Sequence, residues 1–212
     1  MVRRVLASHY KPVPGSDGPS WLTFLGHTTD SLWSLDLFRT ESILLKSHWV
    51  LVVMDQFSRR IIGFAVQPID VDGPSFCRMF NQIIIGADLP RRLSFDQAPL
   101  FDFAQWKANL RILEIDPVRS VPNVPISHPF IERLVSTVRR EYLDHLIYWN
   151  SMDLQRTLDS FRSYYNRIRV HQGIHGEIPD DKAHSKKAQS ISLHRFTWES
   201  HCNGLFHMPI AA

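Results

Sequence analysis

Three short runs rich in β-branched, aromatic and aliphatic residues follow one another closely in the sequence, at residues 32–38, 49–54 and 61–66. Such runs are typical of β-strands. Residues 55–60 form a short polar connector between the second and third runs, of a length that closes a β-hairpin. The runs therefore predict a meander of antiparallel strands. They are far too short to cross a bilayer, so we expect no membrane protein.

The next part of the sequence predicts helices that alternate with strands. Asp72 and Pro74 can open a helix with one apolar face. The residues of that face are Phe76, Met79, Phe80, Ile83 and Ile84. A strand at 92–95, a helix near 102–110 and a strand near 112–115 come next. Because this alternation implies parallel pairing through crossover helices, we predict an α/β fold with a five-stranded mixed sheet flanked by helices.

Prolines and apolar spacing organise the rest of the chain. Residues 121–129 contain three prolines and predict a loop that ends where a helix begins, near 127–129. The buried stripe of this helix is expected to comprise Ile131, Leu134, Val135, Val138, Tyr142 and Leu146. Another helix is expected from about 153 to 168. Residues 1–29, rich in Pro, Gly, Ser and His, predict an N-terminal leader.

Composition limits the class of protein. The chain has 212 residues, 44% of them hydrophobic, which excludes wholesale disorder and fibrous classes. Its two cysteines, Cys77 and Cys202, cannot build a disulfide framework or a Cys-rich zinc site. The formal net charge of +3 permits a nucleic-acid partner without requiring one. We expect a globular protein of the cytoplasm.

Three carboxylates occur at positions that suggest chemistry. Asp36 lies in an apolar strand-like run, where a bare buried charge is prohibitive and a partner or metal ion is required. Asp96 ends a predicted parallel strand, at the edge of the sheet where functional side chains gather. Glu132 lies in the first turn of the helix that follows the proline-rich loop. Positions 97–131, which are 35 residues, separate the second carboxylate from the third.

With this spacing the sequence resembles the catalytic core of the DDE integrases and transposases of retroviruses and bacterial insertion sequences. The segments that carry the resemblance are 33–36, 53–59, 94–96, 128–134 and 139–143, and then the Tyr-Asn, Arg and His of 165–174 with Pro179. The likeness covers roughly residues 30–180. It divides the chain into a leader (1–29), an integrase catalytic core (30–180) and a C-terminal tail (181–212).

The resemblance implies a ribonuclease H-like fold and a metal-dependent polynucleotidyl transferase, which cleaves element ends and joins the freed 3′-hydroxyl to target DNA. Asp36, Asp96 and Glu132 would be the catalytic residues and would hold two Mg²⁺ or Mn²⁺ ions. Three carboxylates within about 4–5 Å repel one another by several kcal/mol per pair, so a site that keeps all three ionised calls for divalent cations. All-oxygen ligation suits these two metals.

The expected partners are DNA, both element ends and target, and further copies of the chain in an oligomer on DNA. The resemblance places the protein in the bacterial cytoplasm, associated with the nucleoid when it acts. Family members usually carry helix-turn-helix domains before the core, whereas 35 residues precede Asp36 here. We therefore expect a separate N-terminal DNA-binding module or subunit. The alternative is a truncated, catalytically silent remnant that binds DNA or a full-length partner.

Two groups of residues are candidates for DNA contact. Ser136, Arg139 and Arg140 follow Glu132 at helical spacing and could place DNA phosphates near the ions. The alternative is that the two arginines merely solvate an amphipathic helix. Arg169 and His171 belong to the second group, for which DNA contact and structural docking are equally compatible with the sequence.

Two further features of the resemblance concern turns. Asp55, Ser58 and Arg59 match the family, but their place in a hairpin connector favours a turn-capping role. Gln97 and Ala98 follow Asp96 where family members often have Asn-Gly, and a positive φ at this turn would strain Ala98.

Overall fold

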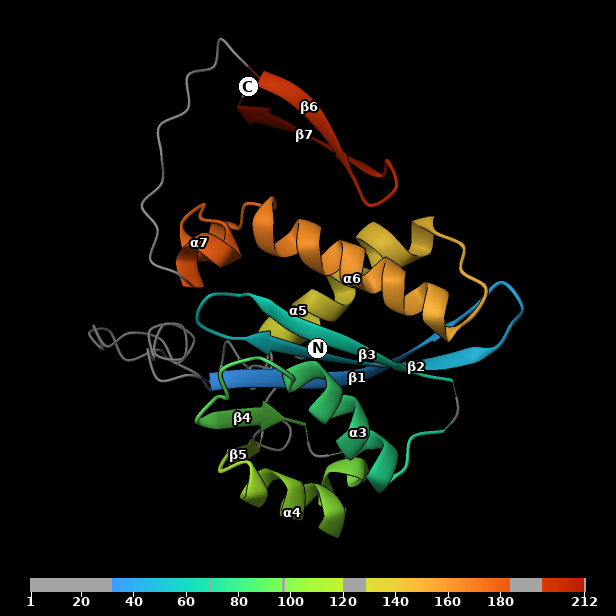
Figure 1. Cartoon of the computed structure of the whole chain (residues 1–212), viewed down its shortest axis with the longest axis vertical. Helices are drawn as coiled ribbons and strands as arrows, with labels where there is room; N and C mark the ends of the chain where they lie inside the picture. Colours follow the sequence, from blue (N-terminus) through green and yellow to red (C-terminus); the bar gives the residue numbers. More distant parts are fainter. Residues whose placement is uncertain (1–31, 69, 97, 120–128, 184–195, 212) are drawn as a thin grey trace, which may run out of the picture.

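A five-stranded sheet lies at the centre of the computed structural model, which describes residues 32–68, 70–96, 98–119, 129–183 and 196–211 (Figure 1). Its strands are β1 (Leu32–Glu41), β2 (Ser47–Asp55), β3 (Ile61–Gln67), β4 (Arg92–Phe95) and β5 (Asp116–Arg119), in the spatial order β3-β2-β1-β4-β5. The first three pair in antiparallel fashion, and β4 and β5 are added in parallel. The predicted mixed sheet is confirmed.

Helices cover both faces of the sheet. One face carries α3 (Gly73–Ile84), the short 3₁₀ helix η1 (Pro99–Asp102) and α4 (Ala104–Ile112). On the other face lie α5 (Pro129–Thr137), which continues through the π-helical η2 (Val138–Tyr142) and the 3₁₀ helix η3 (Leu143–His145), and then α6 (Ser151–Arg167). The 3₁₀ helix η4 (Gln172–Ile174) and α7 (Pro179–Ala183) follow. None of the helices in the described ranges is both long and apolar enough to cross a membrane.

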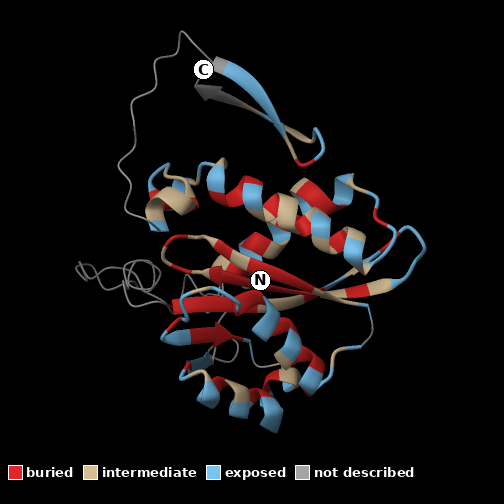
Figure 2. Cartoon of the chain, in the orientation of Figure 1, coloured by how far each residue is buried: buried red, intermediate tan, exposed pale blue. Residues whose placement is uncertain are grey.

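The sheet separates two hydrophobic cores because alternate residues of a strand point to opposite faces. On β2, Val50, Val52 and Met54 pack with α5 and α6, whereas Leu51 and Val53 pack with α3 and α4. All five are at most 1% exposed, and Figure 2 shows the central strands as almost wholly buried. A strand without a polar face is stable only when both of its faces are covered, so the helices on both sides are obligatory.

Helix α3 begins where its predicted N-terminal signal places it. Asp72 is the N-cap: its carboxylate accepts a hydrogen bond from the backbone N–H of Ser75 at 2.8 Å, and the Ser75 hydroxyl oxygen accepts one from the N–H of Asp72, also at 2.8 Å. This reciprocal capping box, with Pro74 in the first turn, sets where the helix begins.

The fifth strand lies later in the sequence than we predicted. Residues 112–115 end α4 and turn, with Glu114 at φ 56°. Ile115 is buried beside α4, and its N–H donates to the carbonyl of Leu110, so this apolar residue serves the core rather than a strand. The pairing with β4 begins at Asp116, opposite Arg92. Short apolar runs do not distinguish a helix end from a strand, which explains the error.

Side chains of α6 hold the outer strand β3 in place. Asn166, 5% exposed, accepts a hydrogen bond from the N–H of Ile61 at 2.9 Å and donates one to the carbonyl of the same residue at 2.8 Å. Arg162 donates to the carbonyl of Ile62 and Gln155 to that of Phe64. These bonds satisfy backbone groups at the sheet edge that would otherwise attract another strand.

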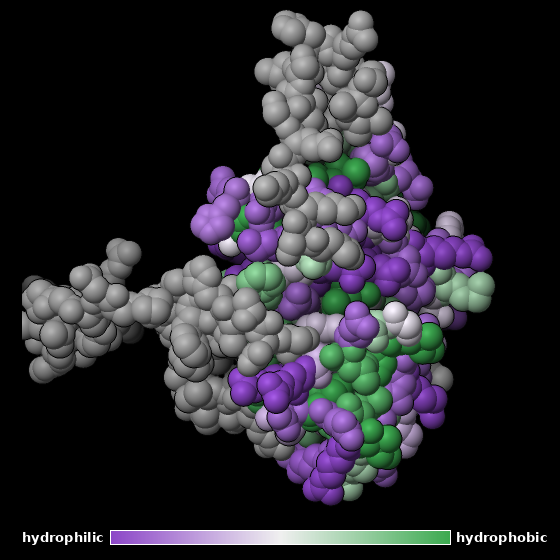
Figure 3. Space-filling model, turned by 60° about the vertical axis from the view of Figure 1, so that its left-hand side comes forward, coloured by the Kyte–Doolittle hydropathy of each residue, from purple (hydrophilic) through white to green (hydrophobic). Residues whose placement is uncertain are grey.

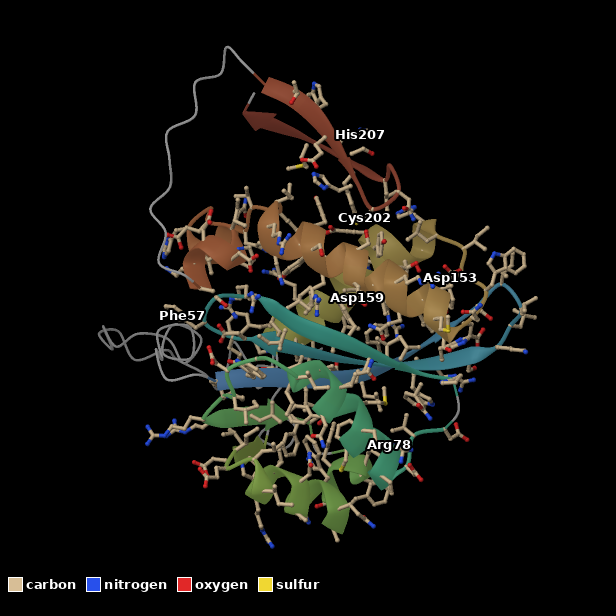
Figure 4. All side chains as sticks on the ribbon, viewed as in Figure 1. Phe57, Arg78, Asp153, Asp159, Cys202 and His207 are labelled. Carbon is tan, nitrogen blue, oxygen red and sulfur yellow. The ribbon has the colours of Figure 1, made fainter. Side chains whose placement is uncertain are left out.

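The C-terminal hairpin, β6 (Phe196–His201) and β7 (Phe206–Ala211), lies beyond α6 (Figure 1). Phe206 stacks on Tyr164 with ring centroids 4.3 Å apart and planes 2° apart. Cys202 is buried in the same core and, like Cys77, is a free thiol; Figure 4 shows Cys202 between the hairpin and α6. The predicted tail thus contains a hairpin that docks on the helical layer. The predicted leader, residues 1–29, lies outside the described residues, and the core boundaries remain a prediction.

Apolar side chains gather on one part of the face that Figure 3 shows. In the view of Figure 3, hydrophilic side chains dominate at the level of the upper helices, and apolar side chains gather lower down, at the level of α3 and α4. The exposed apolar residues of this lower half include Ile85 and Ile112, each 80% exposed, and Leu89 at 43%.

We predict that Asn166→Ala destabilises the fold by about 2–4 kcal/mol, because the N–H and carbonyl of Ile61 would be left buried without partners. Urea unfolding followed by circular dichroism measures this loss. Asn81→Ala is the matched control, since Asn81 makes its amide–amide hydrogen bonds with Asn109 on the exposed surface. Equal losses for the two variants would contradict the proposed edge contact.

Candidate functional site

Asp36 lies in the middle of β1, in the central strand of the sheet. It shares the side of the strand on which Phe38 enters the core formed with α5 and α6, because residues two apart point the same way. Its Oδ1 accepts a hydrogen bond from the N–H of Leu37 at 2.7 Å, and the side chain is partly buried. The sheet therefore presents this carboxylate to the α5 layer.

Asp96 follows the last residue of β4, as predicted. Strands β1 and β4 are parallel neighbours, with Ser34 opposite Ser94. Two residues further along both strands come Asp36 and Asp96, so they lie on adjacent strands and on the same face of the sheet. Gln97 lies outside the described residues.

The turn after Asp96 does not impose the strain that the sequence suggested. Ala98 has φ −58° and ψ 142°, values that any L-residue adopts, and it precedes the 3₁₀ helix η1. The replacement of glycine by Ala98 at this turn therefore has no steric cost.

Glu132 lies in the first turn of α5, and its side chain is exposed. This helix packs across β1 and β2, with Ile131 and Leu134 buried in the core below it. A carboxylate near a helix N-terminus interacts favourably with the helix dipole.

Electrostatics shows that the three carboxylates share one region. The pKa of Asp36 is raised to about 6, chiefly because burial removes water from its carboxylate. The N–H of Leu37 opposes this rise, while the negative charges of Asp96 and Glu132 add to it. The positive charge of Arg139 acts to lower the pKa of Asp36. The charges of Asp96, Glu132 and Arg139 therefore all act on the carboxylate of Asp36.

The carboxylates nevertheless do not close into a ligand set. In the part of the chain that the structure describes, no three His, Cys, Asp or Glu side chains form a group that could hold a metal ion. The expected convergence within a few ångströms is therefore only partial.

The helix after Glu132 changes its geometry before the predicted DNA-contacting arginines. From Val138 to Tyr142 the backbone is π-helical, so the α-helical spacing that we used from Glu132 does not continue past Thr137. Ser136 remains on α5 with an exposed side chain. Such π-helical turns inside α-helices are frequent at functional sites.

Arg139 and Arg140 have different environments. Arg139 donates from Nη2 to the carbonyl of Arg39 at 3.0 Å, and its guanidinium lies 5.2 Å from the centre of the Phe38 ring. Its place beside Asp36 is therefore fixed by contacts with β1. Arg140 is exposed on η2.

Arg169 and His171 lie in a different place from the carboxylates. Arg169 forms a bidentate ion pair with Glu141, with Nη2 donating to Oε1 at 3.0 Å. The ring of His171 packs 4.4 Å from that of Tyr165, and burial lowers the pKa of this imidazole to about 4. Both contacts are internal and are of the kind expected for structural docking, while DNA contact by Arg169 and His171 stays a prediction.

These two residues line a cleft of about 800 Å³ between the β2–β3 turn, α5 and the chain that follows α6. Its walls carry several cations and aromatic rings. The charged and aromatic lining residues include Phe57, Arg59, Phe130, Arg133, Glu141, Tyr165, Arg169, His171 and Lys182. The three candidate carboxylates are not among its lining residues, so the cleft is separate from them.

The β2–β3 turn forms one wall of this cleft. The carboxylate of Asp55 accepts hydrogen bonds from the N–H groups of Phe57 and Ser58 and from the Ser58 hydroxyl, which confirms the predicted turn-capping role for Asp55 and Ser58. Arg59 takes a left-handed conformation, with φ 64°, and its guanidinium lies 3.2 Å from the centre of the Phe130 ring. Sequence reasoning missed this stacking because Arg59 and Phe130 are more than 70 residues apart, and it did not single out Arg133 of α5, which also lines the cleft.

Fold and carboxylate placement together define a ribonuclease H-like α/β protein with acidic residues on two adjacent parallel strands and a facing helix. Residues 113–179 match the model of the family described as the integrase core domain. No curated protein matches the sequence.

Solved structures of retroviral integrases share the fold. A chain of the simian T-cell lymphotropic virus intasome, in complex with PP2A regulatory subunit B56 gamma, aligns with a TM-score of 0.62 at 14% identity, over 80% of this chain and 62% of that one. The HTLV-2 integrase catalytic core domain in complex with magnesium aligns with a TM-score of 0.57 at 14% identity, over 73% of this chain and 96% of that one. The catalytic core domain of BIV integrase aligns with a TM-score of 0.53 at 18% identity, over 74% of this chain and 98% of that one.

The resemblance is confirmed at the level of the fold, which is that of the integrase catalytic cores, and residues 113–179 also match the integrase core family model. It spans 62% of the first of these structures, a chain from an intasome, and nearly the whole length of the isolated catalytic cores.

We predict that Glu141 and Arg169 couple by about 1 kcal/mol in a double-mutant cycle of Glu141→Gln and Arg169→Gln, because the bidentate pair is only partly exposed. Urea unfolding of the four proteins measures the coupling. A coupling near zero, together with a large loss of DNA affinity in Arg169→Gln alone, would instead assign Arg169 to DNA contact.

Proposed function

We propose that the chain is a metal-dependent polynucleotidyl transferase that cleaves DNA at element ends and joins the 3′-hydroxyl to target DNA. The observation that carries the proposal is the placement of Asp36 and Asp96 on adjacent parallel strands and of Glu132 on the helix that packs across β1, with the negative charges of Asp96 and Glu132 acting on Asp36. A cluster of carboxylates of this kind favours the binding of cations. The integrase-core match over residues 113–179 and the fold support the same assignment.

The donor set fits Mg²⁺ or Mn²⁺ in its chemistry. All three side chains offer oxygen ligands, and Mg²⁺ in proteins commonly binds one or two carboxylates and completes its shell with water and substrate phosphate. A complete cage of protein ligands is therefore unnecessary. We propose that Asp36, Asp96 and Glu132 hold two ions. The HTLV-2 core, which has the same fold, was solved in complex with magnesium.

When bound, the ions would supply an activated attacking oxygen and stabilise the leaving oxygen of an in-line phosphodiester displacement. The residues of this chain would provide position and charge. The rigid strands β1 and β4 fix the backbones of Asp36 and Asp96 as neighbours. Arg139, held by the Arg39 carbonyl and the Phe38 ring, would orient a DNA phosphate beside them, and the exposed Ser136 and Arg140 would extend that contact.

The proposal extends to partners and location. A transferase that joins two element ends needs a second active site, so we propose a homo-oligomer assembled on DNA, in the bacterial cytoplasm and at the nucleoid. A separate N-terminal module or subunit would supply recognition of the end sequence. The small net charge of +3 provides little affinity for DNA by itself, which is consistent with recognition of the end sequence by another module or subunit.

The silent remnant remains as a second candidate because the three carboxylates do not form a metal-holding group among the described residues. On that hypothesis the chain folds and binds DNA or a full-length partner without catalysis. A nicking assay with Mn²⁺ on end-sequence oligonucleotides separates the two. A folded sample that shifts DNA but never nicks it favours the remnant.

We predict that Asp36→Asn lowers the rate of strand transfer by about a hundredfold or more, because it removes a charged ligand from the ions. Joining of labelled end oligonucleotides to plasmid measures the rate. Asp144→Asn, an exposed aspartate of η3, is the control for charge removal and should leave the rate unchanged. Metal-dependent joining retained by Asp36→Asn would contradict the assignment.

We also predict that Mg²⁺ or Mn²⁺, at about ten times its Kd, stabilises the wild-type protein by about 1.4 kcal/mol, which raises Tm by about 3–6 °C. The same ion should leave the Tm of Asp36→Asn unchanged. Differential scanning calorimetry with and without EDTA measures both. Equal shifts in the two proteins would mean that the ion binds elsewhere.

A further inference from the structure

The cleft that contains Arg59 is built from positive groups resting on aromatic rings. Arg59 lies 3.2 Å from the centre of the Phe130 ring, and Lys182 lies 5.5 Å from that of Phe57. Figure 4 shows Phe57 at the end of the β2–β3 hairpin, on the side of α7, which carries Lys182. Because cations already cover these rings, the cleft offers charge rather than free aromatic faces to a ligand.

The positive charge in the cleft is only partly neutralised. Glu141 pairs with Arg169, and Lys182 pairs with Glu177 at 3.1 Å. Arg59 and Arg133 make no ion pair within 4.0 Å in the part of the chain that the structure describes. Two guanidinium groups in one cleft thus remain without a carboxylate partner.

Buried polar atoms point to a missing ligand in the same place. Nη1 of Arg59 is buried and has no hydrogen-bond partner, and Nε2 of His171 is in the same condition. Burial lowers the pKa of Arg59 to about 10; Tyr165 and the carboxylate of Asp55 act to raise this pKa, and the positive charge of Arg133 acts to lower it. Nη1 of Arg59 is a buried donor without an acceptor, which is costly, so an oxyanion beside it would relieve both this unsatisfied hydrogen bond and the repulsion between the two guanidinium groups.

The position of the cleft indicates what kind of anion it would take. A volume of about 800 Å³ is far larger than a single carboxylate or phosphate and fits an extended polyanion. Arg133 lines the cleft and directly follows Glu132 on α5, so a polymer held there would lie against the same helix as the candidate catalytic carboxylate. Guanidinium groups bind phosphate through two parallel hydrogen bonds.

We propose that this cleft is a second binding site, separate from the carboxylates and independent of metal ions, for the phosphates of a single DNA strand. Arg59 and Arg133 contact the phosphates, and Arg169 is a positioning residue held by Glu141. The choice of DNA as the polyanion rests on the proposed function, whereas the anion site itself rests on the two guanidinium groups without an ion pair and on the unsatisfied Nη1 of Arg59.

The test uses the full chain, a fluorescent single-stranded oligonucleotide and EDTA, so that binding does not depend on catalysis or on ions. Arg133→Gln changes an exposed side chain and should fold normally; Arg59→Gln is the second variant, with its fold checked by circular dichroism. We expect at least a fivefold rise in Kd for each. The slope of log K against log salt should fall by about 0.7 for each lost phosphate contact.

Arg78→Gln is the matched control, since this exposed arginine lies on α3, on the other side of the sheet (Figure 4). Its Kd should change less than twofold. Equal effects for Arg78→Gln and Arg133→Gln, or no effect of Arg59→Gln and Arg133→Gln, would overturn the proposal.

Competitors identify the source of the phosphate. Unlabelled single strand should displace the probe far better than deoxyadenosine monophosphate or inorganic phosphate. If deoxyadenosine monophosphate or inorganic phosphate competes as well as the single strand, the cleft binds anions, but a DNA strand is not its ligand. If polyglutamate competes equally well, phosphate recognition is overturned. Binding that persists in a protein that never nicks DNA would refute the proposed function and leave the cleft intact.

Discussion

The structure depends on burial of β2 from both sides. Residues 50–54 are all apolar and at most 1% exposed, so this strand cannot occupy a sheet with a solvated face. Helices must cover it twice, and the connections after β3 then place α3 and α4 on one face and α5 and α6 on the other. This two-sided burial positions α5, and with it Glu132, against the face of the sheet that presents Asp36.

The same constraint separates two charged regions along one helix. On α5, Glu132 belongs with the carboxylates of the strands, and the next residue, Arg133, lines the cationic cleft. Burial has opposite consequences for the two signs of charge: it raises the pKa of Asp36 and lowers that of Arg59. The two regions carry charge of opposite sign, so each would be stabilised by a different charged ligand.

Sequence reasoning succeeded where local pattern and core burial agree. The capping box of Asp72, the strand that contains Asp36 and the helix that follows the proline-rich loop all lie where the pattern predicts them. It failed at β5, because the apolar residue Ile115 belongs to the core beside α4 and not to a strand. It also could not foresee the π-helical turn at residues 138–142, since π and α turns bury the same apolar stripe.

Residue type and spacing along the chain sufficed to predict strands β1 to β4, the order of the carboxylates and the resemblance to integrase cores. Only the tertiary structure decided that Arg169 pairs with Glu141, that Arg59 lies on Phe130 and that the three carboxylates stop short of a closed ligand set. Contacts of this kind join residues distant in sequence. Their energies depend on burial and on charges brought close by folding, which no local pattern records.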